Sequence, residues 1–278
     1  MSDYYFEIDK LCCGYGNEFR LKPVSFGLKQ GDLAGIIGPN GSGKTTLLKG
    51  ISGRLPLSSG SIRLNNQDIQ NLKLRQRAQR VAVVSQFIDS AGISVEDYVL
   101  MGRLPYRENF QFFESNRDLT IARKYMRLTG IWPHRKKQLS QLSGGEQQLA
   151  AIAQALTQEP ELLLMDEPTS HLDITHQVQV LNLIQRLNNE LKLTVLMIIH
   201  DLNLAAEYCN HLIMMKDGQL YSQGTPSEVL AYDKIEEVYN TVVVTQNNPL
   251  SGKPAVFLVS EKILEEIKAR YGGINRNQ

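Results

Sequence analysis

One stretch of the chain, between positions 38 and 45, has the residue types and spacing that phosphate binding requires. It follows the pattern G-x-x-x-x-G-K-[ST], in which glycines let successive backbone N–H groups point at one anion. Lys44 adds a full positive charge, the helix expected to follow adds a partial one, and Thr45 is placed to hold a magnesium ion. The sequence therefore predicts a nucleotide-phosphate site; the alternative is a glycine-rich turn that opens an ordinary helix. The residues expected at the nucleotide are Gly38, Asn40, Gly41, Ser42, Gly43, Lys44, Thr45 and Thr46.

Four polar side chains follow three apolar, strand-like runs: Asp166 and Glu167 come after one run, His200 after another and Gln86 after the third. Carboxyl ends of parallel strands meet at one edge of a sheet, so these side chains are expected near the phosphate. Asp166 would reach the magnesium ion through water, Glu167 would accept a proton from an attacking water, and His200 would donate to a terminal phosphate. Gln86 would orient water or ligate the metal. Taken singly, a solvated strand end or a structural histidine is the simpler interpretation, and the presence of Lys44 favours the catalytic one. The runs are 162–165, 194–199 and 81–84.

A second anion-binding device is expected where Ser143, Gly144 and Gly145 precede an apolar-faced helix, because free N–H groups, the helix dipole and a hydroxyl meet there. Either each site holds its own anion, or this turn closes over the nucleotide of a second copy of the chain. Tyr15, between two glycines on a loop, is suited to stack on a flat base. The alternative for Tyr15 is a turn aromatic that rests on its own sheet.

The pattern of elements predicts an α/β fold. Alternating apolar residues over 5–29 predict an antiparallel edge sheet, continuous apolar runs predict buried parallel strands, and strand patterns disappear between 94 and 160, where helical spacing takes over. Asp217 and Gly218 suit a hairpin turn. Four aromatics within 106–113 indicate either a partner surface or the core of the helical lobe. Beyond 241 the chain shows strand and helix patterns without recognisable chemistry.

Charge and composition limit the functions open to the chain. The formal net charge is +1, so no general attraction to nucleic acid is expected. No run of 18 apolar residues occurs, and the first residues lack the features of a secretion signal, so a cytosolic protein is expected. The three cysteines are expected to be buried thiols, without a redox role.

The order of the phosphate loop, Gln86, Leu142-Ser143-Gly144-Gly145, Asp166-Glu167, the loop that ends in Asp173, and His200 resembles the ATP-binding cassette (ABC) family over about residues 5–225. The resemblance implies a P-loop NTPase core with a mixed, mainly parallel sheet, an N-terminal antiparallel β subdomain and an inserted α-helical subdomain. The expected nucleotide-binding domain covers 1–240, with the helical part at about 90–160, and 241–278 is a C-terminal extension.

The family resemblance also implies a mechanism. Two copies would form a head-to-tail dimer that binds ATP and Mg²⁺ and hydrolyses ATP. Tyr15 would stack on adenine and Asp173 would link the two sites. Each ATP site would be built from both subunits. Ser143 and Gly145 of one subunit would meet the following residues of the other: Lys44, Thr45, Gln86, Asp166, Glu167 and His200. Closure of the dimer would then move attached membrane subunits, which contact the helical lobe and the Gln86 loop.

More narrowly, the segments 99–105, 170–173 and 200–203 look like those of ATPase subunits of bacterial importers for iron siderophores, haem and cobalamin. Importers for other cargo, such as molybdate or a metal ion, and non-transport cassettes remain alternatives. The expected partners are transmembrane permease subunits, a second copy of the chain and, indirectly, a substrate-binding protein, at the cytoplasmic face of the membrane. Two departures put lobe packing and site coupling in question: Glu146-Gln147 stands where Gln-Arg is frequent, and Gln154 stands where Arg is frequent.

Three rival classes fit the chain less well. DNA-repair and chromosome-organising cassettes separate the phosphate loop from the Ser143 turn by a long coiled coil, whereas no extended heptad pattern lies between Lys44 and Ser143. A simple phosphate-loop kinase or GTPase would lack the second anion site, and a pure binding module would not need Glu167.

Overall fold

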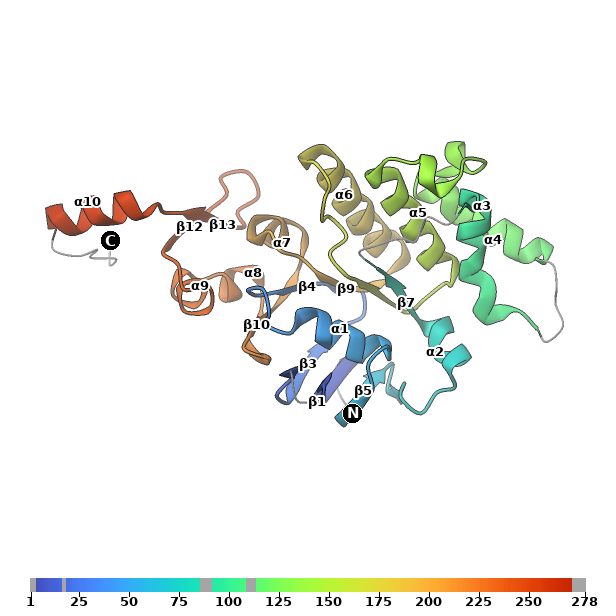
Figure 1. Cartoon of the computed structure of the whole chain (residues 1–278), viewed down its shortest axis with the longest axis horizontal. Helices are drawn as coiled ribbons and strands as arrows, with labels where there is room; N and C mark the ends of the chain where they lie inside the picture. The colour runs from blue at the N-terminus through green and yellow to red at the C-terminus, as the bar shows by residue number, and fades with distance from the viewer. Residues whose placement is uncertain (1–3, 17–18, 86–91, 109–113, 272–278) are drawn as a thin grey trace.

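A computed structural model gives the structure of residues 4–16, 19–85, 92–108 and 114–271 (Figure 1). The predicted catalytic residue Gln86 lies outside these ranges, as do the three phenylalanines of the segment 106–113. Among the described residues, no helix is long and apolar enough to cross a membrane.

A six-stranded sheet forms the centre of the molecule, in the order β11-β10-β4-β9-β8-β7. Its strands pair in parallel except for β11, which closes an antiparallel hairpin with β10. Every residue of β4, β8 and β9 is buried, as expected for strands covered on both faces. The strands are β4 (Leu33–Ile37), β7 (Val81–Val84), β8 (Leu162–Met165), β9 (Thr194–Ile198), β10 (His211–Lys216) and β11 (Gln219–Gly224).

A second, antiparallel sheet is built around β1, which pairs with β2, β3 and β5. This sheet confirms the edge sheet predicted from the alternation over 5–29. Its strands are β1 (Phe6–Tyr15), β2 (Phe19–Arg20), β3 (Val24–Leu28), β5 (Leu57–Leu64) and β6 (Gln67–Asp68).

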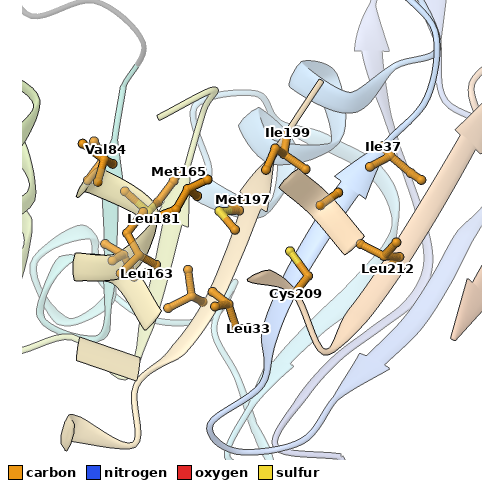
Figure 2. Close-up of a cluster of buried hydrophobic side chains, with 14 of the residues drawn as sticks. Leu33, Ile37, Val84, Leu163, Met165, Leu181, Met197, Ile199, Cys209 and Leu212 are labelled. Atoms are coloured by element: carbon orange, nitrogen blue, oxygen red, sulfur yellow. The ribbon is translucent and has the colours of Figure 1, made fainter. Parts of the chain in front are cut away.

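The two faces of the central sheet bury alternate residues of the same strands. Leu163 and Met165 face a core shared with helices α5 (Gly144–Thr157), α6 (Ile174–Leu191) and α7 (Leu202–Tyr208), part of which Figure 2 shows. Leu162 and Leu164 face the other core, which α1 (Lys44–Ser52) and the antiparallel sheet complete. The polar loops at the strand ends are therefore positioned by a sheet packed on both sides.

The segment between β7 and β8 is helical, as predicted, and has a small core of its own. It lies at the edge of the central sheet in Figure 1, beyond β7. Its elements are α3 (Val95–Leu100), the 3₁₀ helices η1 (Met101–Tyr106), η2 (Trp132–His134) and η3 (Leu139–Gln141), α4 (Asn116–Leu128) and α5. Ser94 caps α3, as its position in the sequence predicts: its hydroxyl accepts from the Asp97 N–H.

The C-terminal segment forms a hairpin, β12 (Val243–Asn247) and β13 (Pro254–Leu258), followed by α10 (Glu261–Tyr271), which projects from the body in Figure 1. The hairpin packs on α7, where the Asn203 amide exchanges two hydrogen bonds with the backbone of Val256. Val243 and Val256 join the main core, so the extension is docked through its first part. Three short helices complete the chain: α2 (Leu74–Arg80), α8 (Pro226–Val229) and α9 (Tyr232–Tyr239).

Candidate ATP site

The phosphate loop joins β4 to α1, and its glycines have backbone conformations that other residues rarely adopt. Gly38, Gly41 and Gly43 have φ values of 146°, 79° and 99°. A Cβ on Gly38 would lie 2.3 Å from the carbonyl oxygen of Met215, so the strand β10 leaves room for glycine only. The hydroxyl of Ser42 behind the loop is buried and has no hydrogen-bond partner among the described residues, which suits a loop that receives a polar ligand.

Lys44 is the first residue of α1, and its amino group turns back onto the loop. It donates to the carbonyl oxygens of Gly38 at 2.8 Å and Pro39 at 2.9 Å, and the side chain is only 5% exposed. Burial lowers the pKa of this ammonium group, while the nearby carboxylates of Glu167 and Asp166 oppose the shift. The loop and the carboxylate edge therefore share one electrostatic environment, as the sequence predicted.

Asp166 and Glu167 follow β8, but their surroundings differ. Burial, and then the charge of Glu167, raises the pKa of Asp166, and its Oδ1 atom is buried without a hydrogen-bond partner in the described structure. Glu167 Oε1 lies 2.5 Å from Nε2 of His200, which stands just after the neighbouring strand β9. Glu167 also has a left-handed backbone, with φ of 52°. One carboxylate thus keeps a buried oxygen without a protein partner in the described structure, and the other is in contact with an imidazole.

A cleft of about 260 Å³ gathers most of the predicted residues. Tyr15, which is 43% exposed, lies at its rim, and Lys49 donates to the Tyr15 hydroxyl at 3.2 Å. Phe19, for which the sequence predicted no role, also lines the cleft. It is the cross-strand partner of Tyr15 in the β1–β2 hairpin, so two aromatic side chains flank one opening. The cleft is lined by Tyr15, Phe19, Asn40, Gly41, Gly43, Lys44, Thr45, Thr46, Glu167 and His200.

The second predicted anion site stands at the start of α5, and its residues are not among those lining the cleft of the same chain. Ser143 is the N-cap: its hydroxyl accepts from the Glu146 N–H at 3.3 Å, and Glu146 Oε2 accepts from the Ser143 N–H at 2.8 Å. A Cβ on Gly145 would lie 2.6 Å from the His176 ring, so the first turn of α5 is in direct contact with α6. Gly145 therefore lets the turn approach the neighbouring helix.

Asp173 caps α6, the helix that faces this turn. Its Oδ1 accepts from the backbone N–H of His176 at 2.8 Å and lies 2.8 Å from the imidazole Nδ1 of the same residue. These contacts hold the pKa of Asp173 below its ordinary range. Asp173 lies beside the Ser143–Gly145 turn, and it is not among the residues that line the 260 Å³ cleft.

Comparison with known families decides the class. The family model described as ABC transporter matches residues 21–170, just over half of the chain, and this range includes the phosphate loop, the Ser143 turn and the carboxylate edge. The chain belongs to the ABC transporter family. It is an ATP-binding subunit that hydrolyses ATP to drive transport, and the predicted family is confirmed.

Sequence similarity to three relatives extends over most of the chain. It is 34% identical to the petrobactin import ATP-binding protein FpuD of Bacillus anthracis, over 89% of this chain and 91% of FpuD. It is also 34% identical to the ferric enterobactin transport ATP-binding protein FepC of Escherichia coli, over 89% of this chain and 92% of FepC. A third relative, the uncharacterised YvrA of Bacillus subtilis, is 37% identical over 90% of this chain, which spans 57% of YvrA.

Two solved structures share the ABC fold. A metal-chelate type ABC transporter in an inward-facing conformation matches with a TM-score of 0.81 and 26% identity, over 94% of this chain and 99% of that one. The dimeric bacterial cassette MJ0796 matches with a TM-score of 0.70 and 26% identity, over 80% of this chain and 98% of that one. The predicted fold class is thereby confirmed.

Two of the three residues that depart from frequent ABC sequences, Glu146 and Gln147, have local partners in the structure. Glu146 completes the cap of Ser143, and its Oε1 lies 3.1 Å from Nε2 of His134. The amide of Gln147 donates at 3.2 Å to two backbone carbonyls that precede the turn. Gln154 lines a groove between the ABC core and the helical subdomain. These contacts account for lobe packing around the turn and leave the phosphate loop untouched.

That groove has a volume of about 620 Å³ and is lined by both apolar and polar side chains. Two of the lining residues, Leu74 and Met101, are large apolar side chains that are 85% and 45% exposed. Among the described residues that line the groove, the charged ones are Arg54 and Arg77, both basic. An exposed apolar surface of this kind is typical of a site where another protein binds.

Proposed function

We propose that the chain is the ATPase subunit of a bacterial importer for iron chelates of the ferric siderophore class. The observation that carries the cargo class is the extended match to ATP-binding proteins named for petrobactin and enterobactin uptake, at 34% identity over about nine tenths of both chains. The structural match to a metal-chelate type transporter supports the same class. The cassette itself contacts ATP, and the membrane subunits select the cargo.

Glu167 serves as the general base and His200 positions it. The 2.5 Å contact between Glu167 Oε1 and His200 Nε2 supports this assignment, because an imidazole N–H that donates to the carboxylate fixes its orientation. Tyr15 and Phe19 flank the nucleobase, and the phosphate-loop N–H groups and Lys44 bind the phosphates.

Mg²⁺ accompanies the nucleotide, with Thr45 and Asp166 as the residues that hold it; Gln86, which lies outside the described residues, remains a predicted ligand. The residues present fit such a cation, because the buried Oδ1 of Asp166 has no protein partner in the described structure and burial raises its pKa. An oxygen-rich site of one carboxylate, one hydroxyl and phosphate oxygens is what Mg²⁺ prefers. When bound, the ion neutralises charge on the phosphates.

Two copies of the chain act head to tail, so that Ser143, Gly144 and Gly145 of one subunit complete the ATP site of the other. The position of this turn away from the cleft of its own chain supports the arrangement, and so does the similarity to a dimeric cassette. Asp173, beside the turn, belongs to the same interface. A mixture of Lys44→Ala and Ser143→Arg chains tests it: each alone should be inactive, whereas their heterodimer retains one intact composite site and should regain ATPase activity. A mixture as inactive as its components would contradict the dimer.

The membrane permease subunits dock in the 620 Å³ groove and hold the ATPase, as a peripheral protein, at the cytoplasmic face of the membrane. The groove supports this because apolar and cationic side chains meet in it, between the ABC core and the helical subdomain. A partner segment in this position contacts both subdomains at once. Movement between them would then be transmitted to the membrane subunits.

The decisive experiment for catalysis is Glu167→Gln. The variant should hydrolyse ATP at least about 10²-fold more slowly while its ATP affinity is kept, because the amide cannot accept the proton but retains the shape of the carboxylate. Glu190→Gln, the same change at an exposed position of α6, is the matched control and should leave turnover unchanged. Near-normal turnover by Glu167→Gln would refute the assignment of the base.

The cargo class is tested by transport. Proteoliposomes that contain the chain, its membrane subunits and the cognate binding protein should accumulate a ferric siderophore only with ATP inside, and the Lys44→Ala complex should not. ATP hydrolysis that is stimulated by a molybdate-loaded or simple metal-ion binding protein, and not by a ferric chelate, would replace the proposed cargo with that one.

A further inference from the structure

One histidine, His176, joins the loop that carries Asp173 to the Ser143–Gly145 turn of the same chain. Its Nδ1 lies 2.8 Å from Oδ1 of Asp173. The opposite edge of the ring faces Gly145, where a Cβ would lie 2.6 Å from Cδ2 and 3.1 Å from Cγ of His176. Real Cβ atoms do not approach this closely, so ring and glycine backbone are in direct contact.

Each of the two loops is also fixed to its own helix by a glutamine one turn into that helix. Gln177 on α6 donates to the carbonyl of Leu172 at 3.0 Å and to that of Thr169 at 3.4 Å. Gln147 on α5 does the same for the segment that precedes Ser143, at 3.2 Å to each of two carbonyls. Since both loops are braced in this way, the contact at His176 joins two stiff bodies.

The junction lies at the surface. The side chains of His176 and Asp173 are 43% and 67% exposed, so they are not held in place by burial in a core. Their positions are fixed by three contacts: the imidazole contact between them, the His176 backbone N–H that donates to Asp173, and the contact of the ring with Gly145. A displacement of Asp173 would therefore be transmitted through the imidazole to Gly145.

We propose that His176 is a positioning residue that fixes the Ser143–Gly145 turn relative to Asp173, so that both are presented to the second subunit as one unit. The inference rests on the proposed head-to-tail dimer. In that dimer the turn supplies half of the ATP site, and a misplacement of about 1 Å in such a group can reduce turnover about 10²-fold. His176 itself lies outside the ATP cleft of its own chain and acts through Gly145 and Asp173.

Two substitutions separate the two contacts. His176→Phe keeps a ring beside Gly145 and removes the hydrogen bond to Asp173; His176→Asn keeps an N–H donor toward Asp173 and removes the ring. Steady-state ATPase assays on the full chain with its membrane subunits should show kcat lowered by roughly 10- to 100-fold in each variant. KM for ATP should change by less than about twofold, because the residues that line the cleft are unaltered. Gln179→Ala, at an exposed position of the same helix, is the control and should leave both constants unchanged.

A double-mutant cycle tests the link directly. The losses in kcat for His176→Phe and Asp173→Ala should be strongly non-additive, because both remove the contact between the imidazole and the carboxylate. Asp173→Ala also removes the cap on the His176 backbone N–H, so its own loss should be the larger. Additive losses, an unchanged kcat in both His176 variants, or a raised KM at unchanged kcat would each overturn the inference. If instead the unsubstituted complex hydrolyses no ATP, the proposed function itself fails. If the wild-type complex is active and the His176 variants have the same kcat, only the role of His176 is refuted.

Discussion

Asp166→Asn is expected to stabilise the nucleotide-free protein. The pKa of Asp166 is raised by burial and by Glu167, and a carboxyl of raised pKa destabilises the fold increasingly as pH rises from its ordinary value to the raised one. That cost persists at neutral pH, and an uncharged amide of the same shape removes it. A buried, unsatisfied polar group costs about 1–3 kcal/mol, and since Asp166 is only partly buried we expect a gain near 1 kcal/mol, or about 2–4 °C in Tm.

Thermal unfolding at neutral pH, with and without a non-hydrolysable ATP analogue and Mg²⁺, is the assay. A ligand at about 100 times its Kd raises the free energy of unfolding of the wild type by about 2.7 kcal/mol. The variant should gain less, because it lacks the carboxylate that binds the cation. With the analogue and Mg²⁺ present, the wild type should therefore be the more stable of the two proteins. Below the ordinary carboxyl pKa, the nucleotide-free proteins should converge. Asp173→Asn is the control: its carboxylate has a lowered pKa, so neutralisation should not stabilise the protein. The reasoning would be refuted if the nucleotide-free Asp166→Asn protein were less stable than the wild type. It would also be refuted if Mg²⁺ and the analogue raised the Tm of the variant as much as that of the wild type.

Two further substitutions test the packing of the helical subdomain and of the phosphate loop. The guanidinium of Arg103 lies 2.8 Å from the carboxylate of Asp118, and both side chains are buried, so Arg103→Leu leaves Asp118 as an uncompensated charge. Urea denaturation should show a loss of about 3–5 kcal/mol in the free energy of unfolding, and a loss below about 1 kcal/mol would contradict this. Gly38→Ala places a Cβ 2.3 Å from the Met215 carbonyl oxygen and should abolish ATP binding in titration calorimetry, whereas Gly130→Ala, with nothing within 4 Å of the added Cβ, should bind normally.

The sequence was sufficient for features that follow from local pattern. Continuous apolar runs predicted the central strands, and Ser94 before two acidic residues predicted the cap of α3, because burial on both faces and capping each leave a direct signal. The ATP cleft followed from a fixed motif and from strand ends that meet at one edge. The three cysteines are buried, as expected. Of the two interpretations of the segment 106–113, the described Tyr106 fits the lobe, since its hydroxyl donates to the Gln158 carbonyl at 2.7 Å.

Features that depend on contacts between distant segments left no such signal. Phe19 lies on a two-residue strand, too short for any periodicity, and only its pairing with Tyr15 places it at the cleft. The short helix α2 lies in a polar segment for which no helix was predicted. His176 is an unremarkable polar residue on a helix until α5 packs against it, so its contact with Gly145 is a product of tertiary structure.

The replacement of a frequent glutamine by Glu146 shows how local contacts offset an unfavourable charge. A carboxylate in the first turn of α5 interacts favourably with the helix dipole, but its negative charge repels a phosphate that binds at the same turn. The hydrogen bond from the Ser143 N–H lowers the pKa of Glu146, so the residue is ionised at neutral pH. Both of its oxygens are engaged, Oε2 by Ser143 and Oε1 by His134 at 3.1 Å. The carboxylate is thereby tied to its own chain, and in the proposed dimer the Ser143 hydroxyl keeps its O–H group to donate to the phosphate at the second subunit.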